Sequence, residues 1–200
     1  MITIHTYDIK KYLDLLLAVI PKKENKLYRA PAGALLICDK DNSTITLVGT
    51  NGYSLVECII QCEEITSPIP DIVLPLSALV DMKALLSDCK DYNIIEIEYY
   101  EGEVYCLSVS TQFKTVRSMI LENKFPAYQR QMKKYSEVTT RTTNLIELIG
   151  LSPKLLCQFL SKVRAESIMI KFIDTKNPIF ITSYDYPNMI YAIMPIDLEG

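Results

Sequence analysis

The chain of 200 residues repeats one structural plan three times. Each copy is predicted to contain a short strand, a helix and then three strands, and the predicted helices begin near Asp8, Ser77 and Ser152. Repeated supersecondary units bury their open faces by stacking, pairing or closing rings, so the repetition constrains the architecture more than any single residue does. The sequence therefore predicts an α+β fold of three βαβββ repeats, with helices on one face of antiparallel sheets.

The helices are predicted from apolar residues at helical spacing and from the residues that flank them. Asp8 is predicted to cap the first helix, which Pro21 ends, and Ser77 to cap the second. Ser152 followed by Pro153 is a typical start of a third helix, which is predicted to run to about residue 164. The strands are predicted at residues 2–4, 34–38, 44–49, 53–62, 71–75, 93–100, 104–110, 113–121, 145–151, 167–173, 179–184 and 189–196.

Composition excludes several classes of protein. The chain is 49% hydrophobic and 22% charged, which is typical of a globular protein. The cysteines form no C-x-x-C pair and His5 is the only histidine, so no metal site or cofactor is predicted. No nucleophile and base occur in a recognisable catalytic pattern, so we do not expect an enzyme. No apolar run is long enough to span a membrane and no signal sequence opens the chain, so we expect a cytoplasmic protein.

Positive charge is concentrated in the predicted helices. Segments 8–23, 77–90 and 152–164 together hold nine basic and four acidic residues, a net charge of +5. The whole chain carries −3, so the remainder carries −8. If all helices lie on one side of a continuous sheet, that side attracts a phosphate backbone and the other repels it. The alternative at this stage is that exposed helix faces carry lysines for solubility.

Three local motifs resemble those of one protein family. They are Leu-Val-Gly-Thr-Asn-Gly-Tyr-Ser-Leu at 47–55, Lys-Phe-Pro-Ala-Tyr-Gln-Arg at 124–130 and Tyr-Ala-Ile-Met-Pro-Ile-Asp-Leu at 191–198. In this order they resemble the motifs of bacterial sliding clamps, the processivity subunit of the replicative DNA polymerase. The resemblance implies the DNA-clamp (processivity) fold. Residues 1–130 resemble a complete middle domain of two units, 131–144 a linker, and 145–200 half of the last domain.

In that family, six domains close a ring around duplex DNA, with helices lining the hole and sheets facing outward. The resemblance implies that the basic helix residues here face DNA: Lys10, Lys11, Lys83, Lys90, Lys154, Lys162 and Arg164. It also implies an apolar pocket for client peptides, walled by Thr50, Gly52, Tyr53, Leu55, Pro126, Arg130, Ile193, Met194, Pro195 and Ile196. The alternative is that several of these are core and turn residues.

The chain also departs from the family pattern. Asn51 stands where the family has aspartate, Ser54 where it has a basic residue, and Asp197 where it has arginine. The charge reversal at Asp197 implies a different choice of client. An unpaired third unit also places the family's dimeric ring in question, and we expect a homo-oligomer in which two half-domains complement each other.

The resemblance implies a non-enzymatic processivity factor that encircles or lies on duplex DNA, without sequence specificity, and tethers a polymerase or other client through a peptide pocket. A clamp loader is a further partner that it allows, and no membrane partner is expected. The alternative function is a clamp mimic that binds a host clamp or its clients and regulates replication.

Overall fold

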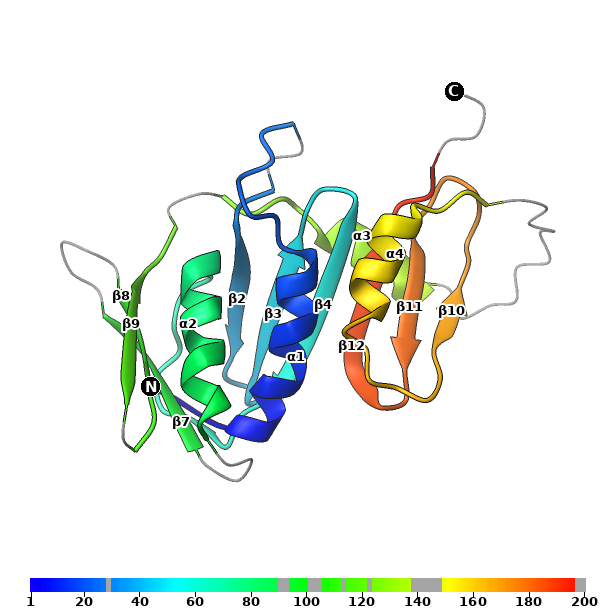
Figure 1. Cartoon of the computed structure of the whole chain (residues 1–200). Helices are drawn as coiled ribbons and strands as arrows, with labels where there is room; N and C mark the ends of the chain where they lie inside the picture. The colour runs from blue at the N-terminus through cyan, green and yellow to red at the C-terminus, as the bar shows by residue number, and fades with distance from the viewer. Residues whose placement is uncertain are drawn as a thin grey trace.

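The described part of the chain forms two antiparallel sheets, with helices side by side along one side of them, as the computed structural model in Figure 1 shows. The structure describes residues 1–27, 30–89, 94–100, 106–112, 114–121, 124–137 and 149–196. The predicted α+β fold with antiparallel sheets is confirmed.

The elements follow the repeated plan. The first unit comprises β1 (Ile2–His5), α1 (Thr6–Val19), β2 (Gly33–Asp39), β3 (Thr44–Thr50) and β4 (Ser54–Gln61), followed by the short β5 (Glu64–Ile65). The second comprises β6 (Ile72–Pro75), α2 (Leu76–Ser87), β7 (Ile94–Tyr100), β8 (Cys106–Ser110) and β9 (Thr115–Met119). After α3 (Gln129–Glu137), the third comprises α4 (Pro153–Leu160), β10 (Met169–Lys171), β11 (Ile179–Ser183) and β12 (Tyr186–Ile193).

The first two units exchange their first strands. β1 leaves its own unit and pairs with β7, so that Ile4 lies opposite Ile95. β6 pairs in turn with β2 of the first unit, where Leu36 lies opposite Ile72. The five-stranded sheet has the order β5-β1-β7-β8-β9. Because each unit completes the sheet of the other, neither buries its backbone groups alone.

The third unit joins the first through one pair of strands. β12 pairs antiparallel with β4, with Ala192 opposite Leu55 and Ile193 opposite Ser54. This pairing makes a seven-stranded sheet in the order β10-β11-β12-β4-β3-β2-β6. The predicted first strand of this unit, 145–151, lies largely outside the described residues, and Gly150 forms an isolated bridge with Ile196. The third unit is therefore an extension of the same sheet.

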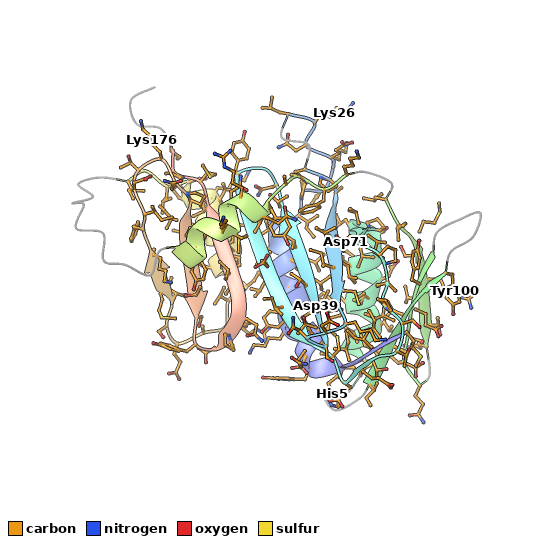
Figure 2. All side chains as sticks on the ribbon, turned by 180° about the vertical axis from the view of Figure 1, so that it is seen from behind. His5, Lys26, Asp39, Asp71, Tyr100 and Lys176 are labelled. Atoms are coloured by element: carbon orange, nitrogen blue, oxygen red, sulfur yellow. The ribbon has the colours of Figure 1, made fainter. Side chains whose placement is uncertain are left out.

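The seven-stranded sheet has an apolar core on each face. Alternate side chains such as Val56, Tyr191 and Ile193 pack under α1, α2 and α4. Leu55, Phe180 and Ala192 belong to a second cluster on the opposite face, against α3 and the segment before it. Figure 2 shows α3 lying across that face, over β4 and β12. The segment from 124 to 137 therefore covers the outer side of the junction between the first and third units.

The predicted linker at 131–144 begins as a helix. α3 is polar except for an apolar stripe formed by Met132 and Tyr135, which pack on the second cluster, on the outer face of the sheet. The ring of Tyr135 lies 5.3 Å from that of Phe180. Residues 138–144 lie outside the described residues.

Only one of the three predicted helix caps is present. Ser152 caps α4, its hydroxyl accepting a hydrogen bond from the backbone N–H of Leu155 at 3.4 Å. Asp8 and Ser77 lie inside helices that begin at Thr6 and Leu76, directly after a strand, without a side-chain cap. The third helix ends at Leu160, before the predicted residue 164. None of the described helices is long and apolar enough to cross a membrane.

Phe159 holds α4 to the sheet, because it is the buried residue of that helix and its ring stacks on Tyr191 with centroids 3.8 Å apart. We expect Phe159→Ala to lower the free energy of unfolding by about 3–5 kcal/mol, since it leaves a cavity at the helix–sheet contact. Cys157→Ala on the exposed side of α4 is the matched control, with an expected change within about 0.5 kcal/mol. Urea denaturation measures both, and equal effects of the two substitutions contradict this role.

Candidate functional site

A groove lies on the outer face of the seven-stranded sheet, where β4 and β12 meet the segment before α3. Its volume is about 200 Å³. The structure brings six of the predicted wall residues together here: Thr50, Gly52, Tyr53, Leu55, Pro126 and Met194. Six further residues complete the lining: Ser54, Ala127, Tyr128, Gln131, Pro178 and Ala192. We call this site the groove.

The turn between β3 and β4 forms one end of the groove and is fixed by its own hydrogen bonds. The side-chain carbonyl of Asn51 accepts from the backbone N–H groups of Tyr53 and Ser54, each at 2.9 Å. The Thr50 hydroxyl donates to the carbonyl of Ser54 at 2.8 Å. Gly52 adopts φ of 93°, a conformation that favours glycine. Asparagine at position 51 thus supplies the acceptor that an aspartate would supply in this turn.

The walls of the groove are apolar and partly open. Leu55 and Ala192 lie opposite each other on the paired strands and are 9% and 5% exposed. Tyr53 and Met194 are 46% and 40% exposed, and the Met194 N–H donates to the Tyr53 carbonyl at 2.9 Å. A buried apolar floor with exposed apolar sides suits a short peptide with one or two large apolar side chains.

Four predicted wall residues do not line the groove: Arg130, Ile193, Pro195 and Ile196. Ile193 lies on the helix side of β12 and is fully buried there, because successive side chains of a strand point to opposite faces. Ile196 donates its backbone N–H to Gly150 at 2.9 Å. Asp197, where the sequence suggested a charge reversal, lies outside the described residues.

Tyr128 links the groove to the strand beneath it. Its hydroxyl donates to the carboxylate of Glu57 on β4. Burial raises the pKa of Glu57, and the hydrogen bond from Tyr128 partly offsets this. Burial, together with the nearby carboxylate, raises the pKa of Tyr128. The family-like motif at 124–130 contains Tyr128, yet the sequence did not identify this residue as part of the wall.

A second depression lies on the helix side and has a volume of about 580 Å³. Five predicted DNA-facing residues line it: Lys10, Lys11, Lys83, Lys162 and Arg164. Tyr7, Leu13, Asp14, Ser87, Asp185 and Tyr186 complete the lining. We call it the basic hollow. Lys154 is exposed at the start of α4 and does not line it, and Lys90 lies outside the described residues.

Some of the positive charge in the basic hollow is engaged within the chain. Lys83 pairs with Asp14 at 2.5 Å between α2 and α1, and Lys10 donates to the carbonyl of Cys89 at 2.8 Å. Lys11 lies over the ring of Tyr186, 4.9 Å from its centroid. Within the described part of the chain, Lys162 and Arg164 form no ion pair. These two are the cations most available to an external anion.

The described residues offer no metal site, since no three His, Cys, Asp or Glu side chains gather among them. Cys58 and Cys62 are buried and free. Burial raises the pKa of Cys62 to about 12 and that of Cys58 further. A thiol that keeps its proton is a poor nucleophile and a poor metal ligand, so these cysteines are core residues.

The arrangement of strands and helices matches solved structures over almost the whole chain. A proposed DNA polymerase III beta subunit from Eubacterium rectale matches with a TM-score of 0.76 at 13% identity, covering 100% of this chain and 66% of that one. The chain has the fold of a bacterial sliding clamp. The DNA polymerase III beta subunit of Thermotoga maritima matches with a TM-score of 0.73 at 18% identity, over 99% and 66%. The sliding clamp of Bacillus subtilis matches with 0.72 at 12%, over 98% and 64%.

No protein-family model and no curated protein sequence matches the chain. The likeness to sliding clamps therefore rests on the fold, and the chain spans about two thirds of the length of these clamps. Both candidate surfaces, the groove and the basic hollow, lie within the part that matches.

Replacing Glu57 with glutamine tests the half-buried carboxylate beside the groove. Because burial raises its pKa above the ordinary 4.5, the folded chain binds this proton more tightly than the unfolded chain. Wild-type stability therefore falls as pH rises from 4.5 through the raised native pKa. The glutamine variant cannot bind this proton. Its free energy of unfolding, relative to that of wild type, should therefore increase as pH rises through this range and stay constant above it.

Urea denaturation at several pH values from about 4 to 8 measures this difference. Tyr128→Phe removes the hydrogen bond that stabilises the carboxylate, so the pH range over which wild-type stability falls should shift to higher pH. A difference between Glu57→Gln and wild type that is the same at every pH contradicts the burial of this group.

Proposed function

We propose that the chain is a sliding-clamp-like processivity factor, which lies on or encircles duplex DNA and tethers a polymerase or another client without catalysing a reaction. The observation that carries the proposal is the placement of two different surfaces on opposite faces of one sheet. The groove lies on the outer face, and the basic hollow lies on the helix face. A protein that holds DNA and a client together needs two such surfaces that do not compete.

The groove suits an apolar peptide of a polymerase or another client. Its floor is buried and its sides are Tyr53, Met194 and Pro126, so a large apolar side chain is removed from water on entering. Backbone groups of the turn at Thr50–Ser54 are already hydrogen-bonded within the chain. The site is thus ordered before a peptide binds, which reduces the entropic cost of binding.

The basic hollow suits a phosphate backbone. Lys162 and Arg164 lie just beyond the end of α4 and line the basic hollow together with Lys10 and Lys11 of α1. Cations of this kind attract duplex DNA without reading its sequence, and the attraction weakens as salt rises.

Met194→Lys should abolish peptide binding, because it places a charge on the apolar side of the groove. Met194 is 40% exposed, so the fold tolerates the change, whereas Leu55→Lys should also destabilise the fold. Ile59→Lys is the matched control, since Ile59 is similarly exposed on β4 but does not line the groove.

Fluorescence anisotropy with a labelled clamp-binding peptide measures this effect. We expect wild type and Ile59→Lys to bind with a Kd of roughly micromolar order, and Met194→Lys to bind at least about a hundredfold more weakly. Equal peptide binding by folded Met194→Lys and wild type contradicts a peptide site in the groove.

Replacing Lys162 and Arg164 together with glutamate tests the DNA surface. The matched control is the pair Lys124→Glu and Lys176→Glu, which changes the net charge equally but lies outside the basic hollow. Retention on closed circular DNA should fall about tenfold or more for the first pair and remain near wild type for the control. An equal loss in both pairs indicates an effect of net charge and contradicts a DNA surface in the hollow.

A polymerase, duplex DNA and further copies of the chain are the partners of this proposal, and a clamp loader is a further one. A second candidate function is a clamp mimic that occupies a host clamp or its clients. The engagement of Lys83 and Lys10 within the chain favours it, because it reduces the charge available to DNA. Peptide binding without retention on circular DNA distinguishes the mimic from a working clamp.

A further inference from the structure

The third unit has a free side, formed by α4 and the outer edge of β10. α1 lies between α2 and α4, and Gln158 of α4 donates to the carbonyl of Ala18 on α1. Among the labelled helices in Figure 1, none lies beside α4 on its other flank, over β10. Only Phe159 of α4 is buried, whereas α1 buries eight residues and α2 five. Among the residues that the structure describes, α4 is therefore packed on one flank only.

The free side exposes apolar surface. Ile170 and Phe172 are 44% and 41% exposed. Ile170 lies opposite the core residue Ile181, so both it and Phe172, two residues further on, face the helix side of the sheet. Leu160 and Val163 at the end of α4 are only partly covered. Within the described residues no strand pairs with the outer edge of β10. Such an edge beside apolar side chains needs a cover.

We infer that the third unit of a second copy of this chain covers this side, in a symmetric pair. The chain itself shows how two such units fit together. The first and second units lie with α1 beside α2, joined by the Asp14–Lys83 ion pair, and they complete each other's sheets. The third unit follows the same plan, but among the described residues no other unit lies against its free side. An identical unit is the surface of matching shape.

The α1–α2 contact predicts the geometry of this pair. Asp14, the ninth residue of α1, forms an ion pair with Lys83, the eighth residue of α2. Lys10, near the start of α1, donates a hydrogen bond to Cys89, which lies beyond the end of α2. The two helices are therefore antiparallel. If two α4 helices cross in the same way, the two-fold axis of the pair passes beside Leu160, the eighth residue of α4, and Ser161, the next residue.

Charge at the two ends of α4 fits this antiparallel arrangement. Lys154 lies in the first turn of α4, and Glu166 lies beyond the other end. Both are exposed. Reversing one helix relative to the other brings Lys154 of each copy toward Glu166 of the other, so opposite charges flank an apolar centre at Leu160, Ile170 and Phe172. The inference requires neither DNA nor a peptide.

Sedimentation equilibrium of the full chain tests the pair. We expect twice the monomer mass of 22.8 kDa at tens of micromolar protein. Phe172→Glu should weaken dimerisation at least about a hundredfold, because it buries an unpaired carboxylate in the contact. Met119→Glu on β9, at the far end of the molecule, is the matched control and should remain dimeric. Circular dichroism checks that both variants fold.

A cross-link tests the geometry independently. With Cys157 replaced by alanine to remove an exposed thiol, Ser161→Cys should form a disulfide-linked dimer on mild oxidation, and Cys157→Ala alone should not. A monomeric wild type overturns the inference. A dimer that survives Phe172→Glu but dissociates with Met119→Glu also overturns it. A dimer in which Ser161→Cys forms no cross-link overturns it as well. None of these outcomes depends on whether the groove binds peptide or the hollow binds DNA.

Discussion

The pairing of β12 with β4 is the interaction on which the rest of the structure depends. It joins strands that lie far apart in the chain into one seven-stranded sheet. On the outer face it places Ala192 beside Leu55, which forms the floor of the groove, and on the inner face it brings α4 next to α1. Without this pairing the groove loses one wall, and the basic hollow loses Lys162 and Arg164.

The two faces of this sheet carry different kinds of side chain. The outer face carries apolar residues under α3, and the half-buried carboxylate of Glu57 interacts there with Tyr128. The inner face gathers lysines from separate helices, and Asp14 neutralises one of them. Successive side chains of a strand point to opposite faces of the sheet, so one strand can contribute different residues to each of the two surfaces. In the proposed function, DNA and a peptide therefore bind to different residues.

The sequence predicted the elements well and their orientations less well. The repeated plan and the turn at Asn51-Gly52 have strong local signals, and both are present. The run Tyr191-Ala192-Ile193-Met194 is apolar throughout, so its alternation could not show that Ile193 faces the helices while Met194 faces the groove. The first two helices begin directly after strands and have no side-chain cap, so the capping residues expected from the sequence misplaced their starts. α3 was missed because few of its residues are apolar.

Amide hydrogen exchange with an apolar clamp-binding peptide and with duplex DNA tests most directly the claim that two separate surfaces serve two ligands. The account predicts that the peptide slows exchange in the turn at 50–55, in 126–131 and in 192–194, and leaves the ends of α1 and α4 unchanged. It predicts that DNA does the reverse. Protection of the same segments by both ligands, or of the helix ends by the peptide, would contradict it.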